Sequence, residues 1–204
     1  AWDWVKKTVK EHERIIFNGN GYSKEWELEA KKRGLANLKT TPEAIESLNR
    51  KENRELLTRS GILSEMEIES RIAIKYQDYH SKAIIEAKTM SRMAHKLYLP
   101  SIHEALKERL EEKQLLGESF EPLEKIIACL MNTLEETCKA LDKLDALLLS
   151  DSKEKRNEKE KAFFASVSLK EAMAELRAPI DRAELLVPKR LWPVPTYGDL
   201  LFHI

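Results

Sequence analysis

The stretch SEMEIESRIAIKYQDYHSKAIIEAKTMSRMAHKL, from Ser64 to Leu97, decides the fold of this 204-residue chain. Its first residues place Ser64 and Glu67 at the spacing of a capping box, which marks the start of a helix. Behind them, apolar residues recur at spacings of three and four, the period of a helix that buries one face. This stripe consists of Ile68, Ile72, Tyr76, Tyr79, Ala83, Ala87, Met90, Ala94 and Leu97. It predicts a long helix packed along other helices.

The sequence after this stripe predicts a second long helical stretch and then a third. Pro100 should bend or break the first helix, because proline lacks an N–H and its ring clashes with the preceding turn. A helical pattern then continues to Leu116 and stops at Gly117. The next helix should start near Pro122. Its apolar seam consists of Leu123, Ile127, Leu130, Leu134, Cys138, Leu141, Leu144 and Leu148.

The segment 150–161 is almost entirely charged or polar, which favours a solvated turn with frayed helix on its far side. A last long helix follows, with Pro179 as an expected kink. Its apolar residues are Phe163, Val167, Met173, Leu176 and Ile180. Because long helices joined by short polar turns bury their stripes on one another, we expect an all-α, elongated antiparallel bundle over residues 61–188.

Residues 1–60 predict shorter helices that precede this bundle. Residues 2–16 show the apolar spacing of a helix. Further on, Thr41 followed by Pro42 suggests a capping residue with proline at the first helical position. One more short helix should cover residues 53–60, with a glycine after its end.

A distinctive turn lies between the first two of these helices. It reads Asn18-Gly19-Asn20-Gly21-Tyr22-Ser23, and its two Asn-Gly pairs can take positive φ at little cost. Ser23 can cap the helix that follows, which should stop at Gly34. Exposed backbone N–H groups here, with Lys24 beside them, could hold a phosphate or a carboxylate. The glycine patterns of nucleotide-binding loops are missing, so a structural turn is the preferred interpretation and a ligand-facing loop is the alternative.

The overall composition argues against two classes of partner. Charged residues make up 34% of the chain and aromatic residues 7%, but 35 basic and 35 acidic residues cancel. No net field would therefore attract nucleic acid or an anionic membrane. No apolar run reaches the roughly 20 residues that a bilayer crossing needs. We expect no nucleic acid and no membrane partner, and no secretory signal.

The sequence predicts no catalytic, cofactor-binding or metal-ligating residue. Metal-site spacings such as His-Glu-x-x-His or Glu-x-x-His do not occur, so the histidines should be ordinary surface residues. They are His12, His80, His95, His103 and His203. Carboxylates near the Asn-Gly turn favour solvated helix faces over a paired-carboxylate site. They are Glu11, Glu13, Glu25, Glu27 and Glu29.

Cys129 and Cys138 fall within one helical pattern, about 13 Å apart along the axis. A disulfide needs Cα atoms within about 7 Å, so these two thiols cannot pair with each other. Two free thiols indicate a reducing compartment, and we expect the protein to be cytoplasmic.

The C-terminal segment, residues 189–204, departs from the helical pattern. It contains Trp192-Pro193-Val194-Pro195-Thr196-Tyr197-Gly198-Asp199-Leu200-Leu201-Phe202, and its prolines and glycine predict an extended tail. Its aromatic and leucine side chains would be unfavourable in water, so the tail should lie in a groove. We expect it to pack against residues 1–40, the other apolar and aromatic segment outside the bundle.

Two local motifs resemble one enzyme family. The first runs Arg14-Ile15-Ile16-Phe17-Asn18-Gly19-Asn20-Gly21-Tyr22-Ser23 and continues through Glu25-Trp26, Ala30, Arg33-Gly34-Leu35 and Asn37-Leu38-Lys39-Thr40-Thr41. The second comprises Trp192-Pro193 and the residues from Pro195 to Phe202. Together they resemble the C-terminal region of type III glutamine synthetases, closely at both ends of the chain and loosely in the helical middle. The motif residues that we single out are Asn18, Gly19, Asn20, Gly21, Tyr22, Trp192, Pro195, Tyr197, Gly198 and Asp199.

The resemblance implies a ligase whose full-length form joins ammonia to glutamate using ATP and divalent metal ions such as magnesium. The family's metal carboxylates and ATP-contacting residues lie upstream of the matched part, so no catalytic residue is carried over to this chain. The resemblance also implies two partners, the chain's own upstream catalytic region and neighbouring subunits of a homo-oligomer. A start at Ala1-Trp2 without methionine favours an inactive fragment of such an enzyme. The alternative is a stand-alone helical scaffold or adaptor protein with no enzymatic activity.

Overall fold

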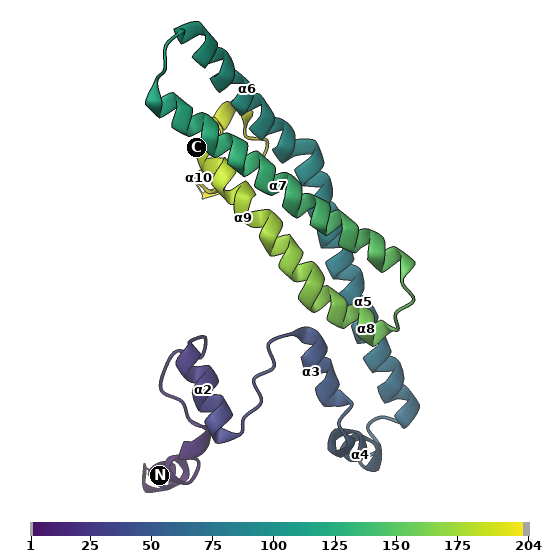
Figure 1. The fold of residues 1–204 in the computed structure, drawn as a ribbon. Coiled ribbons are helices and arrows are strands. Elements are labelled where there is room, and N and C mark those ends of the chain that lie inside the picture. The colour runs from purple at the N-terminus through teal and green to yellow at the C-terminus, as the bar shows by residue number, and fades with distance from the viewer. Residues whose placement is uncertain (1, 202–204) are drawn as a thin grey trace.

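A row of long antiparallel helices dominates the computed structural model, which describes residues 2–201 (Figure 1). The N-terminal helices are α1 (Trp2–Glu11), α2 (Lys24–Arg33), α3 (Thr41–Leu48) and α4 (Lys51–Arg59). The bundle contains α5 (Glu65–Met93), α6 (Leu99–Leu116), α7 (Glu121–Lys153), α8 (Glu158–Phe164) and α9 (Lys170–Leu186). A short helix, α10 (Tyr197–Leu201), ends the described chain. No strand occurs within these described residues, so the prediction of an all-α elongated bundle with short N-terminal helices is confirmed.

Tighter and wider helical turns join several of these helices. Two are 3₁₀ turns, η1 (Glu13–Ile15) and η4 (Lys189–Leu191). Two are π turns, η2 (Ala94–Tyr98), which connects α5 to α6, and η3 (Ala165–Leu169), which connects α8 to α9. The bundle therefore consists of three long helical rods: α5 with α6, then α7, then α8 with α9. Over the residues described, no helix combines the length and apolarity that a membrane crossing requires.

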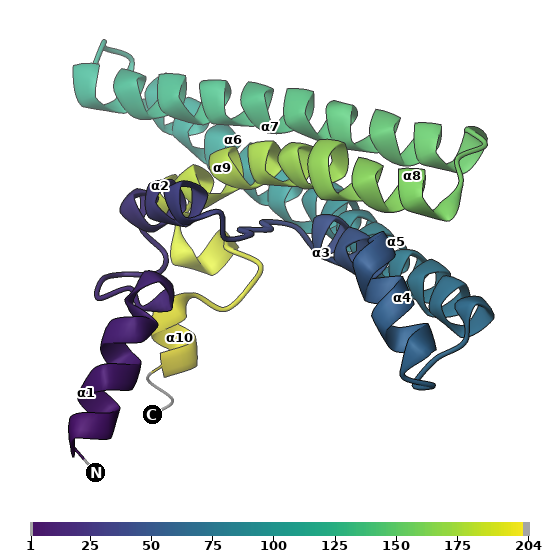
Figure 2. The same cartoon turned by 90° about the horizontal axis from the view of Figure 1, so that it is seen from below.

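Three groups of buried residues form the core. A proximal cluster joins α3, α5 and α8 and contains Ile45, Ile68, Ile72, Tyr76 and Ala162. A central cluster joins α5, α7 and α9 and contains Ala87, Ala94, Leu141, Leu144, Ala165, Leu169, Ala172, Leu176 and Ile180. A distal cluster joins α6, α7 and the end of α9 and contains Ile102, Ala105, Leu106, Leu123, Ile127, Leu130, Ala183 and Val187. Figure 2 shows α7 along one side of the bundle, and α1, α2 and α10 on the other.

The predicted start and stripe of the first long helix are confirmed. The Ser64 hydroxyl accepts a hydrogen bond from the Glu67 N–H at 3.3 Å, and the Glu67 carboxylate accepts one from the Ser64 N–H at 2.8 Å. Every residue of the stripe from Ile68 to Leu97 is buried or half-buried. Gly34, Gly61 and Gly117 follow the ends of α2, α4 and α6 with positive φ, as expected of helix-terminating glycines.

Local differences from the predicted boundaries are small. The cap of α3 is Thr40, one residue before the predicted Thr41, and it forms a capping box with Glu43. The helix expected over residues 53–60 is α4, which begins at Lys51.

The expected break at Pro100 is wrong. The backbone remains helical through Pro100, which lies in the first turn of α6. The π turn η2 comes directly before it. In an α-helix the ring of a proline clashes with the carbonyl four residues earlier, and the wider π turn relieves that crowding. At the second proline, α9 continues through the buried Pro179 to Leu186.

Two of the predicted seam residues face solvent. Val167 is 59% exposed, while Ser166 and Leu169 beside it are buried. These residues lie in the π turn η3. Ala162, Ala165, Ser166 and Leu169 form the buried face at helical spacing, and Val167 lies outside this face. In α7, Cys138 is exposed and Thr137 is fully buried.

Candidate functional site

The Asn-Gly turn is stabilised by local hydrogen bonds. The Asn20 side-chain oxygen accepts a hydrogen bond from the Tyr22 N–H at 3.0 Å, and the Asn20 carbonyl accepts one from the Ser23 hydroxyl at 2.8 Å. Ser23 caps α2 by accepting from the Trp26 N–H at 3.4 Å, as predicted. Asn18 and Tyr22 are exposed. The turn is thus internally satisfied.

The expectation of positive φ at Gly19 and Gly21 is wrong, because neither residue has a positive φ. Gly19 lies close to an aromatic side chain. A Cβ built there would lie 2.7 Å from the Phe17 ring, whose centroid lies 4.9 Å from that of Trp26. Gly21 faces open space. The first glycine of the motif therefore lets the backbone approach an aromatic pair.

Arg33 fastens the segment before the turn to α2. Its Nη1 donates to the carbonyls of Arg14 at 2.8 Å and Ile16 at 2.6 Å, and its Nε donates to Glu29 at 2.6 Å. The hydrogen bond from Arg33 holds the pKa of Glu29 below its ordinary value. These three hydrogen bonds of Arg33 have a structural role, since they hold the segment 14–16 against α2.

The carboxylates near the turn are used separately. Glu27 pairs with Lys39 at 2.7 Å, and Glu11 pairs with Lys7 at 3.8 Å. Together with the Arg33–Glu29 pair, these contacts give Glu11, Glu27 and Glu29 a separate cation each. Within residues 2–201, no three His, Cys, Asp or Glu side chains gather closely enough to hold a metal ion.

The C-terminal motif contacts the core of the bundle through its first residue, Trp192. Trp192 packs against both the central and the distal clusters. The packing of the tail on residues 1–40 stays a prediction. The indole N–H of Trp192 is buried and has no hydrogen-bond partner among the described residues. Pro193 and Pro195, which follow the packed indole, are both exposed.

The prediction of an extended tail is wrong over residues 197–201, which form α10. Thr196 caps this helix: its N–H and hydroxyl donate to the Asp199 carboxylate at 2.9 and 2.8 Å. Lys189 forms an ion pair with the same carboxylate. The Lys189 ammonium, together with the two Thr196 donors, lowers the pKa of Asp199 to about 2. Gly198 lies within α10, and Phe202 lies outside the described residues.

Two histidine–aspartate pairs join the long helices, and no local sequence pattern predicts them. His80 Nε2 lies 3.1 Å from both carboxylate oxygens of Asp151, and Arg156 lies 3.7 Å from one of them. The Arg156 guanidinium also lies over the Phe164 ring, 4.1 Å from its centroid. The predicted solvated turn is confirmed at residues 152–155 and 157, which are exposed. It is wrong at Asp151 and Arg156, whose side chains are largely buried.

A second histidine pair lies nearer the middle of the bundle. Asp145 accepts a hydrogen bond from the Ser91 hydroxyl at 2.6 Å and lies 2.8 Å from His95 Nε2. Because the serine and the histidine both contact the carboxylate, the histidine cannot take a proton from the serine in this arrangement. His12 and His103 are exposed, and His203 lies outside the described residues.

Three polar side chains, Glu46, Tyr76 and Lys159, link α3 to the bundle, and we call this cluster the Glu46 clasp. Glu46 accepts hydrogen bonds from the Tyr76 hydroxyl and from Lys159 at 2.6 Å. The hydrogen bond from Lys159, and then the one from Tyr76, lowers the pKa of Glu46. Burial, and then the Glu46 carboxylate, raise the pKa of Tyr76. Residue Ile45 packs beside this clasp in the proximal cluster.

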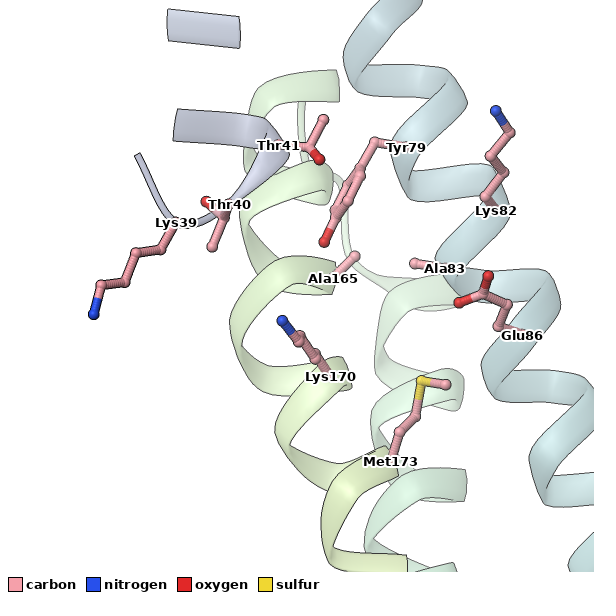
Figure 3. A pocket seen from close by; sticks show the side chains of 10 residues that line it. All are labelled: Lys39, Thr40, Thr41, Tyr79, Lys82, Ala83, Glu86, Ala165, Lys170 and Met173. Carbon is pink, nitrogen blue, oxygen red and sulfur yellow. The ribbon is translucent and has the colours of Figure 1, made fainter. Parts of the chain in front are cut away.

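Figure 3 shows a pocket of about 430 Å³ where the start of α3 meets α5 and the η3–α9 junction. It is lined by Lys39, Thr40, Thr41, Tyr79, Lys82, Ala83, Glu86, Ala165, Lys170 and Met173. Lys39 and Lys82 are already paired with carboxylates at 2.7 Å. A second pocket of about 490 Å³ follows along α5 and α9. The lining of both pockets mixes apolar and charged side chains.

Comparison with known proteins agrees with the motifs. A family model described as the glutamine synthetase C-terminal domain matches residues 2–115. The type-3 glutamine synthetase of Dictyostelium discoideum is 32% identical over 97% of this chain and 28% of its own length. Glutamine synthetases of Butyrivibrio fibrisolvens and Bacteroides fragilis are 35% and 29% identical over 98% and 97% of the chain.

The chain spans only 28–29% of the length of these relatives. The matches nevertheless extend over nearly all of its own residues, including both motifs and the helical middle. The resemblance inferred from the two motifs is therefore confirmed. The chain belongs to the glutamine synthetase C-terminal domain family.

Proposed function

We propose that this chain is the helical C-terminal domain of a type III glutamine synthetase, which joins ammonia to glutamate at the expense of ATP. In this proposal the domain contributes to shape and assembly, and the chemistry belongs to the rest of the enzyme. The observation that carries the proposal is a match over almost the whole chain to proteins named glutamine synthetase, of which it spans less than a third.

ATP and divalent metal ions, with magnesium as the expected ion, would bind outside this chain. Metal-bound phosphates require converging carboxylates, since hard cations prefer oxygen ligands. The described carboxylates do not converge: Glu27 and Glu29 each face a separate cation. The residues present here do not fit a nucleotide–metal site, and we derive no step of the reaction through one.

The N-terminal helices support a docking role. In α1, Trp2, Trp4, Val5 and Val9 are all exposed, although tryptophan and valine side chains favour burial. An exposed apolar patch rimmed by polar residues marks an interaction surface. We propose that α1, α2 and the Asn-Gly turn pack on the catalytic region of the enzyme. The proposal does not extend to α3, which packs on α5 through the proximal cluster.

Assembly into a homo-oligomer is a further part of the proposal, and it is supported by the resemblance to type III glutamine synthetases. We also propose a cytoplasmic location. The exposed Cys129 and Cys138 are both free thiols, and such thiols persist in a reducing compartment.

Two measurements test the proposal. The gene should continue upstream of Ala1 in the same reading frame, with metal-ligand and ATP-binding motifs. A start codon directly before Ala1 would instead support a stand-alone scaffold. The full-length protein should form glutamine from glutamate, ammonia and ATP, and residues 1–204 alone should form none. Synthesis by the shorter polypeptide would refute the assignment of chemistry to the rest of the enzyme.

A further inference from the structure

The two pockets described above adjoin along one face of the bundle. Both are lined by Glu86 of α5, and their other walls come from successive turns of η3 and α9. The α7 helix packs along both α5 and α9. The side of α5 and α9 that α7 leaves uncovered holds the two pockets, and we call it the α5/α9 groove. In Figure 2 the bundle has α7 on one side, and α1, α2 and α10 project on the opposite side.

The floor of the α5/α9 groove is apolar and adaptable. It includes Tyr79, Ala83, Met90, Met173 and Ile180, which belong to the central cluster or pack against it. Methionine side chains suit a surface that must adapt to a partner. Met93 extends the lining, and Ile85 stands on the rim with 64% of its surface exposed. This combination suits an apolar segment laid along the groove.

The rim carries charges of both signs. Lys82 is paired with Asp78, and Arg177 is paired with Asp181 at 3.1 Å. Lys170 makes no ion pair with any residue in the described range 2–201. A partner segment that offers apolar side chains to the floor and a carboxylate to Lys170 would match this surface.

Both family motifs border the groove, at its opposite ends. Lys39, Thr40 and Thr41, which end the first motif, line the pocket at one end. At the other end, Tyr98 lines the second pocket. Its ring contacts the ring of Trp192, the first residue of the second motif. The residues that identify the family thus frame a surface that is open in this chain.

We propose that the α5/α9 groove is the docking site for a segment of the same synthetase polypeptide that lies outside this chain. The inference rests on the proposed function. The occupant follows from length: the relatives continue far beyond the part that this chain spans. It also follows from position, because the groove lies on the side of α5 and α9 that α7 leaves uncovered. In Figure 2, α1 and α10 project on the side of the bundle opposite α7. A second copy of this chain is the competing occupant.

The test uses the full-length synthetase and a pair of matched variants. Ile85 and Ile74 are both isoleucines of α5, exposed by 64% and 59%, but only Ile85 lines the groove. Ile85→Glu would place a charge in the docked interface, and Ile74→Glu is the control. Oxidation of Met90 and Met93 by dilute peroxide, followed by mass spectrometry, reports whether the groove is covered, with the 80% exposed Met66 as internal standard.

In the unaltered enzyme, Met90 and Met93 should be protected relative to Met66. Ile85→Glu should raise their oxidation rate by about tenfold, because a charge buried in an apolar contact weakens it by at least that factor. Ile74→Glu should leave the rates unchanged. Equal rates in all three proteins would overturn the proposal, since the groove would then be open.

A further outcome concerns the competing occupant. If protection disappears on dilution together with a fall in the mass of the assembly, the occupant is a second copy and the proposal is wrong. Glutamine synthesis by the unaltered full-length enzyme is measured separately. A protein that lacks this activity but protects the groove refutes the proposed function alone. An active enzyme with an open groove refutes the docking inference alone.

Discussion

The indole of Trp192 lies against the ring of Tyr98, with centroids 5.3 Å apart and planes tilted by 37°. Tyr98 is the last residue of the π turn between α5 and α6. Trp192 also contacts both the central and the distal clusters. This one aromatic contact therefore fixes the C-terminal segment to the place where two parts of the core meet.

Truncation of this side chain should destabilise the bundle. We expect Trp192→Ala to lower the free energy of unfolding by about 2 to 4 kcal/mol, because a large ring is removed from a packed site and leaves a cavity. Denaturant unfolding measures the change. Trp4→Ala is the matched control: Trp4 is 70% exposed, and its loss should change the stability by less than about 0.5 kcal/mol. Equal effects of the two substitutions would contradict the seating of Trp192.

The parts of the fold that follow local rules could be predicted from the sequence. The capping box at Ser64, the stop at Gly117 and the stripe behind Ile68 each depend on residues a few positions apart. The helix α10 carried the same kind of signal, since Thr196 and Asp199 have the spacing of a cap and a carboxylate three residues later. The nearby prolines led to an extended interpretation instead.

The remaining features depend on contacts between distant elements. Thr137 is buried because its hydroxyl donates to the Thr133 carbonyl at 2.7 Å, which leaves its methyl group free to pack. A threonine does not count as apolar in a periodicity analysis, so Cys138 was assigned to the seam instead. The His80–Asp151 pair joins residues 71 positions apart, and only the register of α5 against α7 brings them together.

The Glu46 clasp leads to a second stability prediction. Tyr76 is almost completely buried, and its hydroxyl donates to the Glu46 carboxylate. Tyr76→Phe should lower the free energy of unfolding by about 1 to 3 kcal/mol, the usual cost of losing a buried hydrogen bond to a charged group. Thermal unfolding with calorimetry measures it. Tyr22→Phe, at a fully exposed position, should be neutral, and a neutral Tyr76→Phe would contradict the role of the clasp.

The cap of α10 should depend on pH in the acid range. The folded pKa of Asp199 is lowered from 3.8 to about 2, so the cap contributes stability above the ordinary pKa and loses it as pH falls toward 2. The Leu200 amide, which donates to the Thr196 carbonyl at 3.1 Å, should therefore shift in NMR spectra between these pH values. Asp199→Asn should abolish this transition. A transition that persists in the variant would belong to another group.

The two glycines of the Asn-Gly turn should respond differently to alanine. Gly19→Ala places a methyl group against the Phe17 ring, which must move away from Trp26. The aromatic pair contributes about 0.5 to 1.5 kcal/mol, so Trp26 fluorescence should change and the turn should loosen. Gly21→Ala meets no atom within 4 Å and should leave the spectrum unchanged. Identical spectra for both variants would show that Gly19 is not required for close approach.

Two neighbouring residues of the π turn η3 differ in burial, and substitution can measure the difference in their contribution to stability. Leu169 is fully buried in the central cluster, and Val167, two residues earlier, is 59% exposed. Val167 follows Phe163 by four residues, but the buried residues Ala162, Ala165, Ser166 and Leu169 form the face that packs on the core, and Val167 lies outside it. Leu169→Ala should lower the free energy of unfolding by about 2 to 5 kcal/mol, through lost burial and a residual cavity.

Val167→Ala should change the stability by less than about 0.5 kcal/mol, because the side chain already contacts water. Both values come from chemical denaturation under the same conditions. The ratio of the two effects is diagnostic, since it reports which of the two side chains faces the core. A large loss at Val167 with a small loss at Leu169 would mean that Val167, and not Leu169, faces the central cluster. The buried face of α9 would then have to be reassigned from Ala165 onward.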